Sequence, residues 1–309
     1  MGAKVWANAR FPKFAFKQWT PKIYKENSRM KLCKKTALWL CVTVLSLLLM
    51  SLTCAASENF GTPIDLYINS NPVEGARLAD GTAYIPYRAG ILAADPEATF
   101  AWDDARGVSV ATSLGMTIEA KADEHYIEAN ARILYTELAK NRNIEGTLYV
   151  PIRAISRAYS LDCAWNAAEK AVYLTGTPTA LEHGDNFYDS DIVYWLSRII
   201  SAESRGEPFR GQIAVGNVVM NRTEDGSFPD TVYGLIFDRK YGTQFSPVAT
   251  GSIYNDPTDS SVRAAKAVLE GVEVVDNALY FCADRVNKGS WMAKNREYVE
   301  TIGNHVFYY

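Results

Sequence analysis

The strongest constraint on the fold is an internal repeat in the first half of the chain. The segment Gly-Thr-Ala-Tyr-Ile-Pro-Tyr-Arg-Ala at residues 81–89 recurs 65 residues later as Gly-Thr-Leu-Tyr-Val-Pro-Ile-Arg-Ala at residues 146–154. A second echo follows each copy, Phe-Ala-Trp-Asp at 100–103 and Cys-Ala-Trp-Asn at 163–166. The alternating residues after each echo, at 108–111 and 171–175, are typical of strands. Such a duplication predicts two similar units within one domain.

Each unit is predicted to contain a strand, a short helix and a strand pair closed by a polar turn. Pro86 and Pro151 are expected to stop edge strands, because proline has no N–H to donate to a neighbouring strand. Two such units, joined by the region 126–135, give an α+β domain at about residues 62–176. Arg88 and Arg153 are equivalent in the two copies, and we expect them to brace the turn.

This duplicated element resembles the stalk-like repeat domain first described at the N-terminus of copper amine oxidases. The resemblance covers roughly 115 residues and implies a non-catalytic spacer, or a module that contacts the wall or accessory proteins. It does not imply copper. A copper site needs several imidazoles or thiolates, whereas this half of the chain supplies only His125 and Cys163.

The first 56 residues have the pattern of an export signal. An apolar run over 36–52 is followed by small residues at 53–57 and preceded by four basic ones, Arg29, Lys31, Lys34 and Lys35. This order predicts a signal peptide that starts at Met30 and is cleaved after Ala56, with residues 1–29 as an upstream extension. An uncleaved membrane anchor is the alternative, because the run is of marginal length for a membrane span.

Cleavage would leave an acidic protein. Residues 57–309 carry 22 Lys and Arg against 34 Asp and Glu, a net charge of −12. This balance argues against a nucleic-acid partner. It also favours recognition of a polymer through neutral sugars and aromatic side chains. The remaining cysteines, Cys163 and Cys282, are expected to be small buried residues rather than a disulfide.

After a turn-rich linker at 177–186, residues 187–309 are predicted to form a second, mostly helical domain. Its first helix places Ile192, Leu196 and Ile199 on one apolar stripe, and Glu203 continues that stripe before Gly206 and Pro208 end the helix. Burial and the negative end of the helix dipole both disfavour a charged carboxylate. A raised pKa at Glu203 is therefore predicted, as a general acid requires. The alternative is a carboxylate at a solvated helix end.

Two further segments of this domain contain polar side chains close together in the sequence. Asn217 and Asn221 lie four residues apart on a second helix, where a functional role, a cap or a buried network would each explain them. The segment Tyr-Gly-Thr-Gln-Phe-Ser-Pro at 241–247 is predicted to be a loop.

Four motifs in this half resemble the spore cortex-lytic cell-wall hydrolases of the SleB/CwlJ type. They are Ala-Glu-Ser-Arg-Gly-Glu-Pro at 202–208, Val-Val-Met-Asn-Arg at 218–222, Gln-Phe-Ser at 244–246 and Ile-Gly-Asn-His-Val-Phe-Tyr at 302–308. The resemblance implies a lysozyme-like fold that acts on peptidoglycan, with the catalytic glutamate at Glu203. Family members often carry a His-rich segment where this chain has Tyr-Phe-Cys-Ala at 280–283.

The scarcity of histidine bears on the reaction. Zinc amidases need several ligands and thiol amidases a Cys–His pair, but from residue 189 onward the chain has only His305. Cleavage of the glycan needs one acid. Glu207, one turn after Glu203, is expected to be structural. With one effective carboxylate, the muramoyl C6 hydroxyl can capture the intermediate and give a 1,6-anhydro product, which is the lytic transglycosylase reaction favoured by the resemblance.

The predicted site contains Glu203 as the catalytic residue and no metal or other cofactor. Gln244, Ser246 and Tyr280 are predicted to bind the glycan strand by hydrogen bonds. Phe245 and Trp291 are predicted either to stack on sugar rings or to pack in the core. An N-acetylmuramoyl-L-alanine amidase and a non-catalytic wall-binding protein remain the alternatives. The exported protein is expected to act in the cell wall or spore envelope, in germination or wall remodelling.

Overall fold

The computed structural model describes residues 60–240, 242 and 244–309. The described residues belong to one compact unit. The predicted signal peptide and extension lie outside the described residues. Within the described part of the chain, no helix is both long and apolar enough to cross a membrane.

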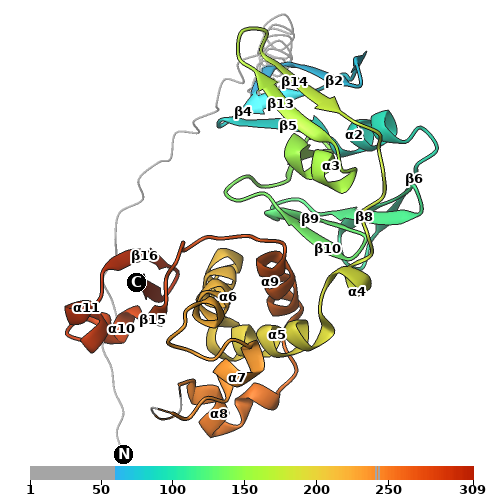
Figure 1. Cartoon of the computed structure of the whole chain (residues 1–309). Helices are drawn as coiled ribbons and strands as arrows, with labels where there is room; N and C mark the ends of the chain where they lie inside the picture. Colours follow the sequence, from blue (N-terminus) through green and yellow to red (C-terminus); the bar gives the residue numbers. More distant parts are fainter. Residues whose placement is uncertain (1–59, 241, 243) are drawn as a thin grey trace, which may run out of the picture. The chain divides into compact units, whose positions relative to one another are not determined.

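The N-terminal part of the unit is rich in β-structure, with two short helices. In chain order its elements are β1 (Thr62–Pro63), β2 (Asp65–Ile68), β3 (Asn71–Pro72), β4 (Arg77–Ala79), β5 (Thr82–Pro86), α2 (Tyr87–Ala94), β6 (Thr99–Asp103), β7 (Val108–Ser113), β8 (Met116–Ala120), β9 (Tyr126–Ala129), β10 (Arg132–Tyr135), β11 (Arg142–Ile144), β12 (Thr147–Pro151), α3 (Ile152–Ala158), β13 (Asp162–Asn166) and β14 (Ala171–Thr175). Three sheets result, in the orders β1-β4-β5-β12-β11, β10-β9-β8-β7-β6 and β13-β14-β2-β3. Figure 1 shows α2 and α3 between these sheets.

The two copies of the repeat meet each other in the first sheet. β5 pairs with β12 antiparallel, and Ile85 lies opposite Val150, its own counterpart in the other copy. Tyr84 lies opposite Pro151, and Pro86 opposite Tyr149. Equivalent residues therefore exchange places across a local two-fold axis. The symmetry ends at the outer sheets, since β7 pairs antiparallel with β8 whereas β14 pairs parallel with β2.

The prediction that the prolines stop edge strands is wrong. β5 and β12 are interior strands of the first sheet. Pro86 and Pro151 are the last residues of these strands and precede the first residues of α2 and α3. At that position the missing N–H costs little, and the fixed φ of proline suits the turn into a helix. Arg88 is exposed and lies 4.4 Å from the centre of the Phe100 ring, which accounts for its packing without a ligand.

The predicted linker at 177–186 runs along the β9–β10 turn. The side-chain amide of Asn130 donates to the Leu181 carbonyl at 2.6 Å, and Gly184 N donates to the Asn130 carbonyl at 2.9 Å. The short helix α4 (Gly184–Phe187) begins within the segment. Linker residues are thus bonded to the domain that precedes them.

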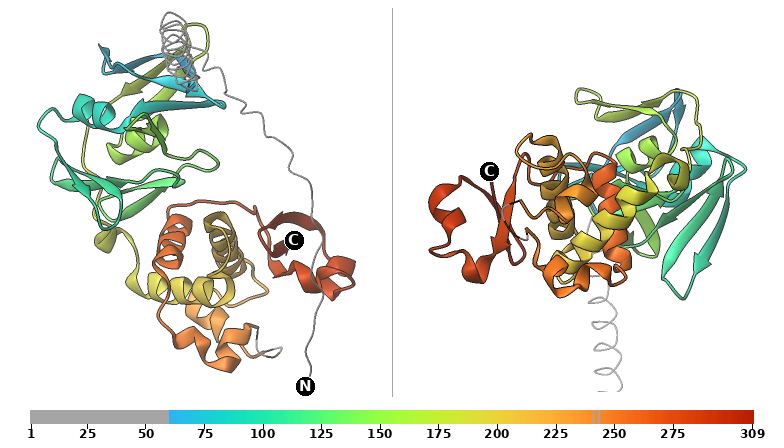
Figure 2. Two further views of the ribbon diagram at one scale, coloured as in Figure 1. Left: turned by 180° about the vertical axis from the view of Figure 1, so that it is seen from behind. Right: turned by 60° about the horizontal axis from the view of Figure 1, so that its bottom comes forward.

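The C-terminal part is mainly helical and ends in a small sheet. It contains α5 (Ser190–Ser204), α6 (Phe209–Glu224), α7 (Val232–Ile236), α8 (Ser246–Thr250), the 3-10 helix η1 (Ser252–Tyr254), α9 (Asp259–Leu269), β15 (Tyr280–Ala283), α10 (Asp284–Asn287), α11 (Trp291–Asn295), β16 (Tyr298–Ile302) and β17 (His305–Tyr308). The strand order is β15-β17-β16. Figure 2 shows this sheet and the two short helices α10 and α11 as a lobe beside α6. The prediction of an α+β protein, with a β-rich N-terminal and a helical C-terminal domain, is confirmed.

The paired asparagines of α6 form a hydrogen-bond network, in which Asn217 is buried and Asn221 is half-buried. Asn217 donates to the Val272 carbonyl at 2.7 Å and accepts from Val274 N at 2.9 Å. Asn221 donates to the carbonyls of Asp276 and Ala278 at 2.7 and 3.0 Å. These bonds fix the segment between α9 and β15 against α6, because buried backbone groups need partners.

The helical and β-rich domains are joined by a buried ion pair. Arg132 of β10 donates from Nε and Nη2 to the two carboxylate oxygens of Glu270, at 2.7 and 2.8 Å. Tyr188 OH donates to the same carboxylate at 2.6 Å, and the Arg157 guanidinium lies 3.7 Å from it. The side chain of Glu270 is only 3% exposed. Since Glu270 caps the negative end of α9, these donors offset an unfavourable dipole.

A close helix contact predicts a substitution effect at Gly216. A Cβ there would lie 2.8 Å from Val268 Cγ2 and 2.9 Å from Ile200 Cδ1. Overpacking costs about 1–3 kcal/mol, more than the roughly 1 kcal/mol by which alanine favours a helix interior over glycine. We expect Gly216→Ala to lower the free energy of unfolding by about 1 kcal/mol in denaturant titrations. Gly226→Ala is the control, because nothing lies within 4 Å of its added Cβ. An unchanged Gly216→Ala protein would contradict the close packing.

Candidate active site

Glu203 lies in the last turn of α5, on the stripe that packs the helix into the core. Leu196, Ile199 and Ile200 of this stripe are fully buried, and the Glu203 side chain is half-buried. Burial raises the pKa of the Glu203 carboxyl above its ordinary value, and the positive charge of Arg222 opposes the rise. This direction agrees with the one expected from the sequence. A carboxyl group in this setting can hold a proton and release it.

Arg222 of α6 is the cation that faces Glu203, and it is buried. Its Nε donates to the Leu279 carbonyl at 2.7 Å, and its Nη1 lies 3.4 Å from Gln244 Oε1. The guanidinium also lies 5.5 Å from the ring centre of Phe245 and 5.6 Å from that of Tyr280. Burial lowers the pKa of Arg222 to about 10, so the group stays charged at neutral pH. Arg222 thus connects Glu203 with three residues predicted to bind substrate.

Gln244 is oriented by a carboxylate. Its Nε2 donates to Asp238 Oδ2 at 2.7 Å, which leaves Oε1 turned to Arg222. The backbone N–H of Lys240 donates to the other oxygen of Asp238 at 2.9 Å and is the main cause of its lowered pKa. Asp238 is therefore ionised and acts here as the acceptor that positions Gln244.

Tyr280 and Trp291 come together around a further arginine. Arg296 donates from Nη2 to Tyr280 OH at 2.7 Å. Its guanidinium lies 4.2 Å from the Tyr280 ring centre and 5.1 Å from that of Trp291. Trp291 is 59% exposed at the start of α11. Of the two interpretations for Trp291, an exposed ring available for stacking fits the structure.

Phe245 fits the other interpretation, which is packing in the core. It is 3% exposed and packs in the core with Leu235 and Ile253, so its ring has no open face for a sugar. Ser246, the first residue of α8, is exposed. Phe245 is therefore a core residue, and its ring centre lies 5.5 Å from the Arg222 guanidinium.

The Glu207 carboxylate accepts hydrogen bonds from the β16–β17 turn. It accepts from Asn304 N at 2.7 Å and from Asn304 Nδ2 at 3.1 Å. Gly303 sits against it with φ +59, where a Cβ would lie 2.1 Å from Glu207 Oε2. Only glycine fits this turn. Glu207 thus has the structural role expected from the sequence.

Cys282 and His305 lie on opposite faces of the small sheet. Cys282 is opposite Val306 and Ala283 is opposite His305 in the β15–β17 pair. Because successive side chains of a strand alternate between faces, a thiol–imidazole pair cannot form. His305 packs 5.4 Å from the Phe281 ring centre and is buried. Among the described residues, no group of three or more His, Cys, Asp or Glu is arranged to hold a metal ion.

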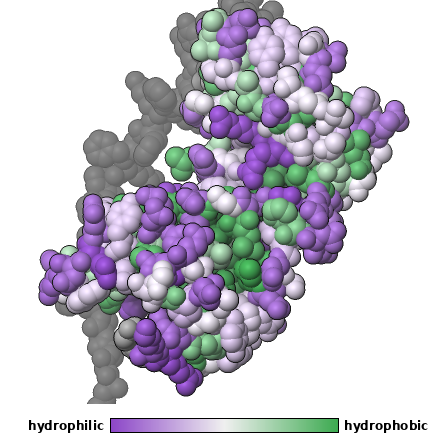
Figure 3. Space-filling model, in the orientation of Figure 1, coloured by the Kyte–Doolittle hydropathy of each residue, from purple (hydrophilic) through white to green (hydrophobic). Residues whose placement is uncertain are grey.

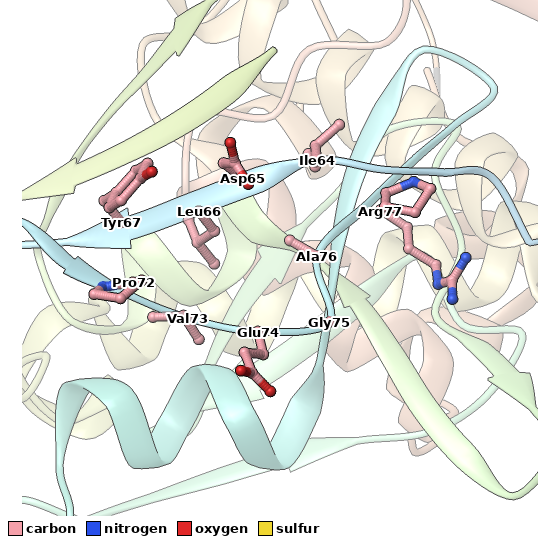
Figure 4. Close-up of a pocket in the computed structure, with 11 residues that line it drawn as sticks. Ile64, Asp65, Leu66, Tyr67, Pro72, Val73, Glu74, Gly75, Ala76 and Arg77 are labelled. Atoms are coloured by element: carbon pink, nitrogen blue, oxygen red, sulfur yellow. The ribbon is translucent and has the colours of Figure 1, made fainter. Parts of the chain in front are cut away.

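A cavity of about 240 Å³ in the β-rich domain lies away from these residues. Figure 4 shows it between β2 and the segment that connects β3 to β4, with Asp65, Glu74 and Arg77 around it. None of its lining residues belongs to the helical domain. This cavity is therefore not part of the group around Glu203.

Three residues of this group were missed by reasoning from the sequence: Arg222, Asp238 and Arg296. Arg222 ends the Val-Val-Met-Asn-Arg motif at 218–222, where a charged residue at the end of an apolar helix face was an available signal. Asp238 and Arg296 lie in irregular segments without periodicity. Their proximity depends on contacts between distant parts of the chain.

Comparison with known proteins agrees with this division of the chain. The copper amine oxidase N-terminal domain family matches residues 67–174, and the cell wall hydrolase family matches residues 206–308. Glu203 lies three residues before the second match.

The relatives found are spore cortex-lytic enzymes. That of Bacillus cereus is 34% identical over 122 residues, which are 40% of this chain and 46% of the relative. That of Bacillus subtilis (strain 168) is 30% identical over 120 residues, 39% of this chain and 38% of the relative. The chain therefore spans less than half the length of these relatives.

Two solved structures are also similar. One is the catalytic domain of the germination-specific lytic transglycosylase SleB from Bacillus anthracis, with 32% identity, a TM-score of 0.36, and coverage of 42% of this chain and all of that one. The other is the catalytic domain of the Bacillus cereus SleB protein, with 34% identity, a TM-score of 0.36, and coverage of 40% and 92%. The residues of the C-terminal domain are similar in sequence to these catalytic domains. The chain thus carries a copper amine oxidase N-terminal domain followed by a C-terminal domain of the SleB-like cell wall hydrolase family.

Proposed function

We propose that the C-terminal domain cleaves the glycan backbone of peptidoglycan between N-acetylmuramic acid and N-acetylglucosamine, as a lytic transglycosylase. The observation that carries the proposal is Glu203, a half-buried carboxyl with a raised pKa at the end of α5. The homologous catalytic domain of Bacillus anthracis SleB, described as a germination-specific lytic transglycosylase, supports the same reaction.

In the proposed reaction one residue acts twice. Glu203 first donates its proton to the glycosidic oxygen, the bond from that oxygen to the muramoyl C1 breaks, and N-acetylglucosamine leaves with a new O4 hydroxyl. The C6 hydroxyl of the same muramoyl residue then bonds to C1 and gives its proton back to Glu203. No water is consumed, and a 1,6-anhydro ring results.

Two features favour this route over hydrolysis. Among the described groups that shift the pKa of Glu203, Arg222 is the charged one and no carboxylate contributes. Glu207 and Asp238 are both used in structural hydrogen bonds. Arg222 would stabilise the ionised form of Glu203 between the two steps, because an opposite charge favours the carboxylate.

The product distinguishes this function from its alternatives. Digestion of purified peptidoglycan by the full chain is expected to give anhydro-muropeptides, identified by mass. Reducing muramic acid ends would instead indicate hydrolysis, and new L-alanine amino termini an amidase. Binding without products would leave a wall-binding protein.

We further propose that the protein acts outside the cell, in the wall or in the spore cortex during germination. Loss of anhydro products from germinating spores that lack the gene would test this role.

The raised pKa of Glu203 predicts the pH dependence of both activity and stability. Activity needs the protonated carboxyl, so the rate should stay high above the ordinary pKa of glutamate and fall as pH rises through the raised pKa. Protonation of this group in the folded state contributes stability that is complete below the unfolded pKa and is lost as pH rises through the folded pKa. Digestion rates and thermal unfolding between pH 4 and 9 measure the two trends. A rate that rises across this whole range would contradict the role as an acid.

A further inference from the structure

The segment from Arg285 to Arg296 differs in charge from the rest of the protein. It holds four basic residues and no acidic one, within residues 57–309 that have a net charge of −12. The segment covers α10 after its first residue, Asp284, together with α11 and the connections around them, and Glu297 follows it. At the left of Figure 3, this end of the C-terminal domain is covered by hydrophilic side chains.

Arg296 is held in place within this segment. Its Nη2 is bonded to Tyr280 OH at 2.7 Å, and its guanidinium packs against the rings of Tyr280 and Trp291. Arginine stacked on aromatic rings keeps a defined plane while its other N–H groups stay available. The side chain is thus fixed although the residue is exposed.

Arg296 differs in its partners from three other arginines of the protein. Arg132, Arg198 and Arg210 each form an ion pair with a carboxylate. Within the described ranges, 60–240, 242 and 244–309, Arg296 forms no such pair. The Tyr280 ring instead has two guanidinium groups near its centre, that of Arg222 at 5.6 Å and that of Arg296 at 4.2 Å. Two positive charges are thus placed near Tyr280, and that of Arg222 also acts on Glu203, whose pKa it lowers.

We propose that Arg296, with Trp291 and Tyr280, forms a subsite that binds a carboxylate of the peptide attached to a muramoyl residue. The subsite rests on the function proposed above, in which a glycan strand passes Glu203. Arginine recognises carboxylates through two parallel N–H···O bonds, and the peptide substituents are the anionic groups of that strand. The exposed Trp291 ring would contact the apolar face of the same substituent. Strands without these carboxylates would then be held more weakly.

Binding can be tested without cleavage. The probe is the disaccharide GlcNAc–MurNAc with its tetrapeptide, which lacks the MurNAc–GlcNAc bond that is cut, and its comparison is the same compound with the peptide carboxyls converted to amides. We expect the full chain to bind the native probe at least about tenfold more tightly than the amidated one in calorimetry, because hydrogen bonds to charged groups are stronger than those to neutral groups. Arg296→Gln should bind both forms equally. Arg88→Gln is the matched control, an exposed arginine over an aromatic ring in the other domain, and should keep the tenfold preference.

Three results would overturn the proposal. They are equal binding of both probes by the unaltered chain, a preference that persists in Arg296→Gln, and displacement of the native probe by an equal concentration of glycerol phosphate. The last would assign the subsite to phosphate polymers of the wall. The proposed function fails separately, since it requires anhydro products from peptidoglycan, whereas the subsite requires only the difference between the two probes.

Discussion

Glu203→Gln is expected to reduce the release of anhydro-muropeptides from peptidoglycan by at least about 10³-fold. General acid–base catalysis by one positioned group contributes about 10²–10⁴-fold, and here the same carboxyl would act in both steps. Glutamine keeps the size of the side chain but can neither donate a proton to the leaving oxygen nor accept one from the C6 hydroxyl. Soluble muropeptides would be separated by chromatography and identified by mass.

Glu207→Gln is the matched control for this substitution. It lies four residues further on, and the amide oxygen of glutamine can still accept from Asn304 N. We expect activity within a few-fold of the unaltered chain, together with a lower melting temperature. The assignment of the acid is overturned if Glu203→Gln retains more than a tenth of the activity, or if Glu207→Gln loses as much.

Glu270→Gln is expected to cause the largest loss of stability. It would leave the largely buried Arg132 without its carboxylate, and breaking a buried ion pair from one side costs about 3–5 kcal/mol. For a unit of this size, such a loss lowers the melting temperature on the order of 10 °C. Thermal unfolding of the full chain at pH 7 measures the change.

Glu300→Gln provides the comparison for Glu270→Gln. Arg210 donates two similar bonds to Glu300, at 2.6 and 2.7 Å, but the Glu300 side chain is 39% exposed. Exposed pairs contribute about 0–1 kcal/mol, so this variant should melt within a few degrees of the unaltered chain. Replacing Arg132 and Glu270 together by methionine should recover much of the loss, because a hydrophobic pair leaves no buried charge. Equal effects of Glu270→Gln and Glu300→Gln would show that burial of the first pair is unimportant.

The parts of the fold that depend on local pattern could be predicted from the sequence. The repeat predicted the strand–helix–strand-pair units, and the stripe through Leu196 and Ile199 predicted α5 as far as Glu203. The position of the repeat strands within their sheet could not be predicted, because it depends on which distant strand pairs with them. Pro86 suggested an edge when read alone, but it lies opposite Tyr149 of the other copy.

In the candidate site, too, the features that depend on local pattern could be predicted and those that depend on distant contacts could not. A raised pKa at Glu203 could be predicted because its position on the apolar stripe and its position at the helix end both disfavour the charged carboxylate. Arg222 and Arg296 gain their importance from neighbours on other elements, Gln244 and Tyr280, which no spacing connects to them. Phe245 could not be assigned because a loop residue has no periodicity to separate a buried ring from an exposed one. Its burial follows from the packing of α5, α7 and η1.

The pairing of β5 with β12 has the form of a homodimer interface. Ile85 lies opposite its own counterpart, Val150, and the residues on either side of Ile85 lie opposite each other's counterparts. Two identical subunits related by a two-fold axis pair in the same way. The N-terminal domain can therefore be regarded as a dimer whose subunits have been fused into one chain. Fusion makes the association of the two copies intramolecular, so this domain assembles independently of the protein concentration.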